Sequence, residues 1–272
     1  MRPLCAMLSG MPGTQKTGAV AVFLDAGYRV VVADFDGNCD PLYVFAKDTS
    51  KLVVVPFFDS LEANTTDGDG KNSYRRTNTV SAVRRFGSFM DRGDKELGLT
   101  PPATWGEDTV FLWDSLTTTA ESAERLALKL NGGVRTAGAH IGVLGDEITS
   151  LVTMFRNPAW KCHRLMVTHL KLIGPKGEIQ GETALQQTVK QERADLEEFR
   201  YVPNMPGNLV AGSIASKFPT CLLFEQFNGR HVIRTKPVPA YTIKVPATVE
   251  DRLPAETGLM TILKAMNGES AQ

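Results

Sequence analysis

Cysteine and histidine are scarce in this sequence, which has four of each among its 272 residues. No two cysteines form a C-x-x-C pair, and no histidine has zinc-ligand spacing with another histidine or with a cysteine. These absences argue against a zinc site. The cysteine pattern also favours a reducing, cytosolic setting.

Long apolar runs are absent as well. No stretch approaches the ~20 residues that a membrane-spanning helix needs, and Met1-Arg2-Pro3 leads directly into a short apolar segment without a signal peptide. We therefore expect a soluble intracellular protein with no membrane partner. Neither sign of charge prevails, since 30 Lys and Arg balance 30 Asp and Glu. A nucleic acid would have to be held by a local basic patch rather than by the net charge.

The signatures of three common enzyme classes are missing. The sequence has no G-x-S-x-G elbow of a serine hydrolase, no G-x-G-x-x-G dinucleotide loop after the first apolar segment, and no Asn-Lys-x-Asp to read guanine. These absences argue against a serine hydrolase, a dinucleotide enzyme and a GTPase.

One motif is present in nearly complete form. Residues 8–18 read Leu-Ser-Gly-Met-Pro-Gly-Thr-Gln-Lys-Thr-Gly and follow the phosphate-binding pattern G-x-x-x-x-G-K-[ST], except that Gln15 replaces the second glycine. An apolar run precedes the motif at residues 4–8, and a helical pattern follows it at residues 17–26. Strand, loop and helix are the context that such a motif requires.

The loop residues predict the chemistry of a nucleotide site. Backbone N–H groups would surround phosphate oxygens, Lys16 would add a full charge, and Thr17 would be a ligand for Mg²⁺. The predicted nucleotide-binding residues of the loop are Gly10, Met11, Pro12, Gly13, Thr14, Gln15, Lys16, Thr17 and Gly18.

Gln15 is the irregular position of the loop. Glycine is favoured where backbone approaches phosphate closely, so the glutamine side chain must point away from the phosphates or the loop must widen. We expect binding of ATP to survive this change. Whether turnover survives is left open by the sequence.

Further apolar segments of the chain end in polar residues. The carboxyl ends of parallel strands meet at one edge of a sheet, where ligands bind. A carboxylate at that edge can hold the water shell of Mg²⁺ opposite the loop threonine, and we assign this role to Asp114. The polar ends are Asp34 to Asp36, Asp114-Ser115 and Thr168-His169.

Glycine-rich or polar stretches predict flexible loops at about residues 61–74, 132–145 and 172–206. The most basic stretch, residues 75–92, has helical character. Arginines of this stretch and of the second loop are the predicted nucleic-acid contacts, namely Arg75, Arg76, Arg84, Arg85 and Arg135.

Together these patterns predict an α/β fold in which helices flank a mostly parallel central sheet. Helical apolar patterns continue to residue 130, with Thr118 and Glu121 as a capping box at the start, and again over residues 146–157. The size suits one large domain with extensions.

The C-terminal part predicts a different arrangement. Asn228-Gly229 joins two short strand patterns, which indicates an antiparallel hairpin. A last helical pattern covers residues 258–266, for which we expect packing on the surface or on a neighbouring copy. We divide the chain into a core, residues 1–240, and a C-terminal extension, residues 241–272.

The order of these parts resembles the ATPase core of the RecA-type recombinases, and the short chain resembles the phage RecA-like single-strand-annealing ATPases of the Sak group. In that family, an acidic residue after the second strand activates the attacking water, and Asp-Pro-x-Tyr follows four residues later. The matching residues here are Asp36 and Asp40-Pro41-Leu42-Tyr43. The resemblance implies that Asp36 positions water and that Asp40 and Tyr43 contact adenine.

The resemblance implies further roles. Asp36 stands where the family usually has Glu. Its side chain is one methylene shorter, so its carboxylate would need a closer approach or a bridging water, which favours slower hydrolysis. His169 occupies the place of a sensor for the γ-phosphate. Arg234 and Lys236 match two basic residues that reach the γ-phosphate held by an adjacent subunit. The implied catalytic residues are Lys16, Asp36, His169, Arg234 and Lys236.

As a function, the resemblance implies a phage recombination protein that uses ATP and Mg²⁺ to anneal or exchange single-stranded DNA. It would act in the host cytoplasm as a filament or ring with ATP at the subunit interface, and a phage single-strand-binding protein is a further implied partner. Two alternatives stay open. One is a ring-forming, helicase-like motor, and the other is an ATP-stabilised DNA-coating protein with negligible turnover.

Overall fold

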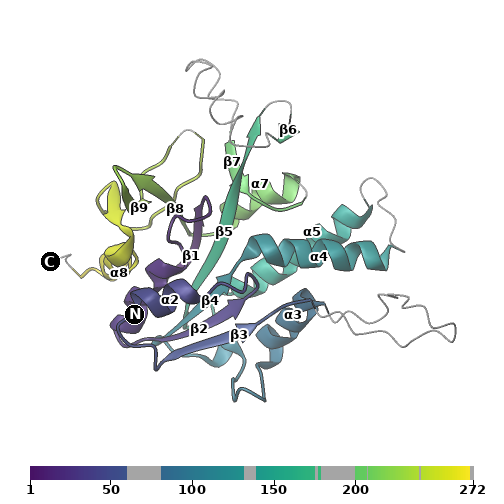
Figure 1. The fold of residues 1–272 in the computed structure, drawn as a ribbon, viewed down its shortest axis with the longest axis horizontal. Coiled ribbons are helices and arrows are strands. Elements are labelled where there is room, and N and C mark those ends of the chain that lie inside the picture. Colours follow the sequence, from purple (N-terminus) through teal and green to yellow (C-terminus); the bar gives the residue numbers. More distant parts are fainter. Residues whose placement is uncertain are drawn as a thin grey trace.

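One large sheet forms the centre of the molecule (Figure 1). The computed structural model describes residues 1–59, 81–131, 139–174, 177–178, 200–206, 208–238 and 240–269. The strands are β1 (Cys5–Gly10), β2 (Arg29–Asp34), β3 (Leu52–Pro56), β4 (Thr109–Asp114), β5 (His163–Gly174), β6 (Gly177–Glu178), β7 (Arg200–Pro203), β8 (Thr220–Phe227), β9 (Arg230–Arg234) and β10 (Arg252–Pro254).

The sheet is parallel in its middle and antiparallel at its C-terminal side. Its strands follow the order β10-β9-β8-β1-β5-β4-β2-β3, and β6 and β7 pair with the far end of β5. Neighbours from β8 to β3 run parallel, whereas β9 and β10 are antiparallel to their neighbours. The predicted α/β class, with a mostly parallel sheet and a C-terminal hairpin, is therefore confirmed.

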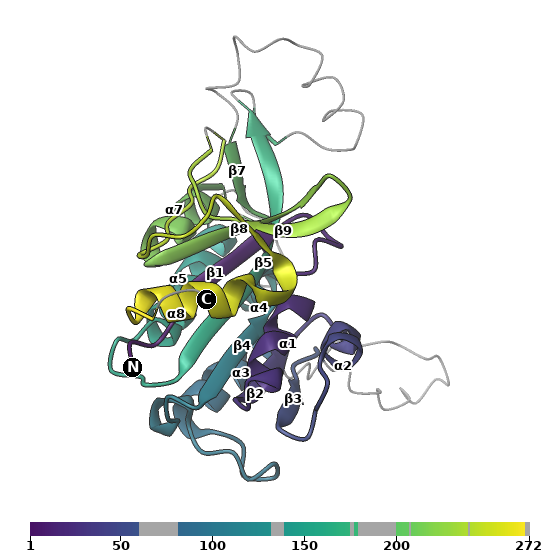
Figure 2. The ribbon, with the colours of Figure 1, turned by 90° about the vertical axis from the view of Figure 1, so that its left-hand side faces the viewer.

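Helices cover both faces of this sheet (Figures 1 and 2). Helices α3, α4, α5 and α7 pack on one face, and η1, α1, α2 and α8 pack on the other. Their bounds are η1 (Gly18–Val20), α1 (Ala21–Asp25), α2 (Asp40–Phe45), α3 (Ala82–Arg92), α4 (Leu116–Leu130), α5 (Ala139–Phe155), α7 (Asn208–Lys217) and α8 (Ala255–Met266), with a short 3₁₀ turn η2 at Pro102–Thr104.

The two-sided cover explains why the strands are continuous apolar runs in the sequence. Along β1, Cys5 and Met7 enter the core under one face, and Ala6 and Leu8 enter the core under the other. Successive side chains of a strand point to opposite faces. In a strand that is covered on both sides, both sets of positions face the core and are therefore mostly apolar. Among the described residues, no helix combines the length and the apolarity needed to cross a bilayer.

Helix α4 begins earlier than the sequence predicts. The capping box at Thr118 and Glu121 is wrong: the N-cap is Ser115, whose side chain accepts a hydrogen bond from the Thr118 backbone N–H at 3.5 Å. The chain turns from β4 directly into the helix, so the first hydroxyl after the strand caps it.

The loop predicted at residues 132–145 is also wrong at its end, because α5 already begins at Ala139. Leu144 is buried and continues the apolar face of Ile148 by one turn. A side chain at Gly145 would come within 2.9 Å of Val210 on α7, so this glycine permits close packing instead of ending the helix. Tertiary packing outweighs the low helix propensity of glycine here.

The long loop predicted at residues 172–206 is wrong at both ends. Strand β5 continues to Gly174. Strand β7 pairs with it, from Leu170 opposite Pro203 to Ile173 opposite Arg200. Pairing between distant segments leaves little signal in a polar sequence. The predicted loop at residues 61–74 lies outside the described residues, as do residues 132–138, 175–176 and 179–199 of the other two.

Helix α8 packs on its own chain. It begins at Ala255, and its apolar side lies in the same core as η1 and α1. Figure 2 shows α8 near both termini, and the backbone N–H of Arg2 donates to Asn267 Oδ1 at 2.7 Å. The C-terminal helix thus supports the segment that follows the predicted phosphate-binding loop.

Candidate functional site

The predicted phosphate-binding loop leaves the centre of the sheet at the end of β1. A side chain at Gly10 would collide with the Phe224 carbonyl and come within 2.7 Å of Thr14 Oγ1. At the other end, a side chain at Gly18 would come within 2.7 Å of the Phe45 ring. These glycines are therefore also required by packing.

The helix after the loop differs from the expected single helix over residues 17–26. The chain first makes the 3₁₀ turn η1, and the α-helical part, α1, ends at Asp25. Gln15 has a φ of +66°, in the left-handed region that glycine adopts most readily. Its backbone thus takes the conformation of the glycine that the motif normally has there.

Lys16 is held by the loop itself. Its side chain lies inside, with the residue only 4% exposed, and Nζ donates to the carbonyl oxygens of Gly10 at 3.0 Å and Met11 at 2.8 Å. Burial lowers the pKa of Lys16 to about 8, although Asp114 and Asp36 act in the opposite direction. The loop is closed on its own lysine, which has to leave these carbonyls to reach a phosphate.

Thr17 and Asp114, the two predicted metal ligands, are in contact. Thr17 Oγ1 donates to Asp114 Oδ2 at 2.7 Å, although 96 residues of sequence lie between them. Asp114 is 2% exposed. Burial raises its pKa to about 7, and the neighbouring Asp36 adds to this, while the hydrogen bond from Thr17 opposes it.

The donor set fits Mg²⁺ only in part. No group of three or more His, Cys, Asp or Glu suited to a metal occurs in the described part of the chain. Thr17 and Asp114 supply one hydroxyl and one carboxylate, and Mg²⁺ in nucleotide sites normally keeps several waters and binds phosphate oxygens. The pair therefore suits Mg²⁺ that arrives with a nucleotide.

Asp36 lies beside this pair and is held by three side chains. Its Oδ1 accepts hydrogen bonds from Ser115 Oγ, at 2.9 Å, and from Thr118 Oγ1, while its Oδ2 lies 3.7 Å from His169 Nε2. Burial acts to raise the pKa of Asp36, but the interaction with His169 and the hydrogen bonds from Thr118 and Ser115 outweigh it, so the pKa is lowered. Asp36 is thus a fixed carboxylate.

Sequence reasoning missed Ser115 and Thr118 as partners of Asp36. The signal was present in part, because Ser115 directly follows Asp114 and was named as a polar end of its strand. Asp34, also at a strand end, shapes the turn: its Oδ1 accepts the backbone N–H groups of Asp36 at 3.1 Å and Gly37 at 2.8 Å.

The residues assigned to adenine lie on α2, which packs against η1. Asp40 opens this helix, and Tyr43 is 55% exposed on it. The exposed side chains of α2 also include Val44 and Phe45, so the helix offers apolar surface next to the loop. The role of Tyr43 toward a base stays a prediction.

Arg234 ends β9, two strands away from β1, and Lys236 follows it. Strand β8 lies between β1 and β9, and Arg234 Nη1 lies 3.7 Å from Glu225 Oε2. Lys236 is exposed just after β9. Their role toward a neighbouring subunit stays a prediction.

The predicted nucleic-acid arginines are only partly within the described residues. Arg84 is exposed on α3. Arg85 donates to the Phe58 carbonyl at 2.6 Å and lies 5.8 Å from the centre of the Phe57 ring, so it is in part a packing residue. Arg75, Arg76 and Arg135 lie outside the described residues.

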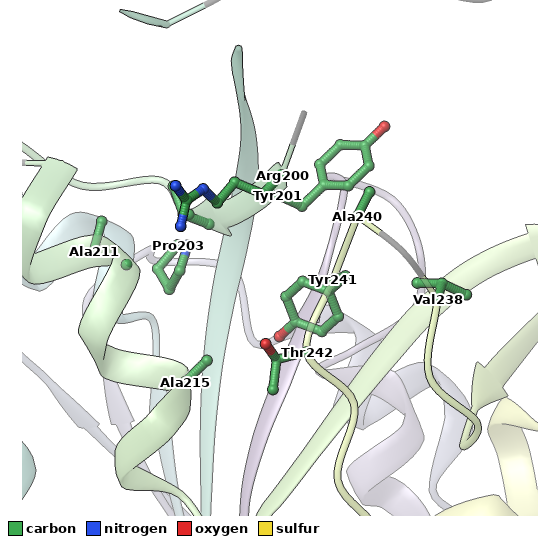
Figure 3. Close-up of a pocket in the computed structure, with 11 residues that line it drawn as sticks. Arg200, Tyr201, Pro203, Ala211, Ala215, Val238, Ala240, Tyr241 and Thr242 are labelled. Carbon is green, nitrogen blue, oxygen red and sulfur yellow. The ribbon is translucent and has the colours of Figure 1, made fainter. Parts of the chain in front are cut away.

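A cavity of about 300 Å³ lies between α7, β7 and the segment around Tyr241 (Figure 3). None of the predicted site residues lines it. Figure 3 shows the side chains that line it, with Tyr241 and Thr242 on one segment and Ala211 and Ala215 on α7. The Tyr241 hydroxyl donates to Ser9 Oγ at 2.5 Å, one residue before Gly10. This buried hydrogen bond joins the wall of the cavity to the strand that carries the loop.

No protein-family model and no curated protein matches the sequence. Among solved structures, it is similar to the assembled ATPase EscN, in complex with its central stalk EscO, from the type III secretion system of enteropathogenic E. coli: the TM-score is 0.43 and the identity 10%, over 89% of this chain and 49% of EscN.

A second similar structure is a prototypical ATPase from the type III secretion system of pathogenic bacteria. The TM-score is 0.41 and the identity 11%, over 82% of this chain and 51% of that one. The chain thus spans about half the length of both ATPases. These similarities concern the fold and carry no conclusion about ligands or partners.

Proposed function

We propose that the chain is a RecA-like ATPase that binds Mg-ATP at the loop from Gly10 to Gly18. The observation that carries this proposal is the contact of Thr17 with Asp114 beside a buried Lys16. A strand–loop–helix motif alone occurs in many proteins. A motif threonine bonded to a carboxylate at the end of another buried strand is the arrangement that a Mg-nucleotide needs.

Phosphate binding would begin with Lys16. Its ammonium group exchanges the carbonyl oxygens of Gly10 and Met11 for phosphate oxygens, which carry a full negative charge and attract it more strongly. Backbone N–H groups of the loop complete the cradle. Burial lowers the pKa of Lys16 to about 8, and a phosphate ligand would raise it again by stabilising the charged form.

Thr17 and Asp114 would hold Mg²⁺, which supplies charge neutralisation for the β- and γ-phosphates. Asp114 has to be ionised for this role. Its raised pKa means that part of the population carries a proton at neutral pH, so binding of Mg-ATP would release protons.

Asp36 would orient the attacking water. With a lowered pKa it stays ionised at neutral pH and accepts a hydrogen bond from water. A weakly basic carboxylate positions water better than it removes a proton, so we expect modest turnover. His169, 3.7 Å from Asp36 Oδ2, is placed to respond when that oxygen changes partners.

For the biological role, we propose phage recombination on single-stranded DNA by an oligomer with ATP between subunits. The resemblance to the Sak group supports it, and Arg234 and Lys236 are the residues that we assign to the γ-phosphate of a neighbouring subunit. Exposed Arg84 is the described basic residue that we assign to DNA. A phage single-strand-binding protein is the partner that we expect to cooperate with it.

A second candidate is an ATP-stabilised coating protein with negligible turnover. Two features favour it, namely the glutamine at position 15 in place of glycine and the lowered pKa of Asp36, which makes this carboxylate a weak base. Phosphate release with and without single-stranded DNA separates the two functions. A ring motor is a third outcome, and imaging the protein with ATP and single-stranded DNA distinguishes closed rings from open filaments.

The proposal is tested by the variant Lys16→Ala. Calorimetry should show Mg-dependent binding of ATP to the natural chain, and loss of the charge should weaken it by about 100-fold or more, since charge-assisted hydrogen bonds to phosphate are lost. The matched control is Lys51→Ala, an exposed lysine that donates to the Gly27 carbonyl at 2.7 Å. If the natural protein takes up no ATP at millimolar concentration, the proposed function is wrong.

A further inference from the structure

The first turn of α4 presents two hydroxyl groups to Asp36. Ser115 is the N-cap of the helix and is fully buried, and Thr118 lies one turn later and is partly exposed. Both donate to the same carboxylate oxygen, Oδ1. The other oxygen, Oδ2, is left on the side of His169.

These contacts form a directed chain of hydrogen bonds. The Thr118 backbone N–H donates to Ser115 Oγ, and the Ser115 hydroxyl donates to Asp36. A hydroxyl that accepts one hydrogen bond donates the next one more strongly. The Asp36 backbone N–H is in turn held by Asp34, so the carboxylate is fixed at its main chain and at one oxygen.

The register of the sheet explains how α4 reaches Asp36. Strands β2 and β4 are parallel neighbours, and Asp34 pairs with Asp114 at their carboxyl ends. Asp36 and Ser115 therefore leave the sheet side by side. A short side chain at this position meets the first turn of α4, and aspartate provides it.

We propose that Thr118, acting with Ser115, is a positioning residue that fixes Asp36 Oδ1 so that Oδ2 alone is presented to water and to His169. This inference rests on the proposed ATPase function. It deepens that function, because it assigns to this chain a device for using an aspartate where the resembled family usually has a glutamate.

The consequence for catalysis is geometric and electrostatic. A carboxylate that rotates freely holds water in many orientations. Most of these orientations do not suit attack on the phosphate, so the rate gained from a fixed reacting geometry is partly lost. The two hydroxyl donors also keep Asp36 ionised, since they stabilise the charged form. Both effects become weaker when the hydroxyl of Thr118 is removed, because only Ser115 then donates to Oδ1.

The test compares Thr118→Val with Thr118→Ser. Valine keeps the shape and removes the hydrogen bond, and serine restores it. For Thr118→Val we expect kcat to fall about tenfold or more with little change in KM for ATP, and the acid limb of the pH–rate profile to move to higher pH. Thr118→Ser should recover most of kcat and the original acid limb.

A control variant isolates the role of this hydroxyl from the general cost of the substitution. Thr153 is exposed on α5, and its Oγ1 donates to the Thr149 carbonyl of its own helix. Thr153→Val makes the same chemical change away from the site and should leave kcat and the pH profile unchanged. Thermal unfolding of all three variants checks that they are folded.

A second readout does not depend on hydrolysis. The ¹³C carboxyl resonance of Asp36, titrated by NMR, should show a higher pKa in Thr118→Val than in the natural chain and in Thr153→Val. If the Asp36 pKa is the same in all of them, or if serine does not restore what valine removes, the positioning role is wrong. If the natural chain hydrolyses no ATP but the Asp36 pKa responds, the ATPase proposal fails while the contact itself is supported.

Discussion

Gln15 shows how one residue can set the properties of the loop. A residue with a Cβ in the left-handed region costs about 1–2 kcal/mol relative to glycine, and Gln15 has a φ of +66°. Gln15→Gly should release this strain and let the backbone approach phosphate, tightening ATP binding by about three- to tenfold in calorimetry. Gln15→Ala keeps the Cβ and should give no such gain. Equal affinities for the glycine and alanine variants would contradict this explanation.

His163 is a buried residue whose protonation should control acid stability. Its Nδ1 accepts the Leu4 backbone N–H at 3.0 Å, and its Nε2 donates to the Glu107 carbonyl at 3.0 Å, which fits the neutral ring. Burial lowers its pKa from 6.5 to about 4. The unfolded chain therefore binds a proton that the folded chain does not, and stability is lost as the pH falls from 6.5 toward 4.

The expected loss amounts to about 3 kcal/mol across that window, from 1.36 kcal/mol per pKa unit. Urea unfolding at pH 7.5 and at pH 4.5 measures it. In His163→Gln the titrating group is gone, so this variant should lose less stability on acidification than the natural chain. A parallel pH dependence of both proteins would show that other groups cause it.

At the scale of elements, the sequence did not decide whether α8 packs on its own chain or on a neighbouring copy. The helix packs against η1 and α1, which follow the predicted phosphate-binding loop. Ile262 is fully buried in the core that includes η1 and α1. Ile262→Ala should lower the free energy of unfolding by about 2–5 kcal/mol, the range for large-to-small changes in a core. It should also weaken ATP binding. Thr257→Ala, at an exposed position of α8, should change stability by less than about 0.5 kcal/mol.

The elements that the sequence predicts well are those with strong local patterns. Strands buried on both faces appear as apolar runs, and their polar ends correctly placed Asp114 next to the loop threonine. The start of α5 was missed because Gly142 and Gly145 suggested a loop, whereas burial of Leu144 continues the helix. Strand β7 was missed because its pairing with β5 depends on contacts between distant segments.

At the scale of the whole molecule, the sheet order decides which side chains meet. Strand β4 lies between β2 and β5, so Asp36 and Ser115, which follow β2 and β4, come close to His169 within β5. A mostly parallel sheet could be inferred from the sequence, whereas the order of its strands was not predicted. The orientation of the Ser115 and Thr118 hydroxyls could not be inferred either, because it depends on how tightly the chain turns from β4 into α4.

Strand β5 is long enough to connect the site beside Asp36 with the part of the structure where it pairs with β7. His169 lies near its middle, and the strand continues to Gly174, about 16 Å further at 3.3 Å per residue. The backbone N–H of Asn204 donates to the His169 carbonyl, and β7 braces the rest of the projecting part. The part of β5 beyond His169 is therefore held in place by pairing with β7, and a displacement of His169 would be transmitted through this paired strand toward Gly174.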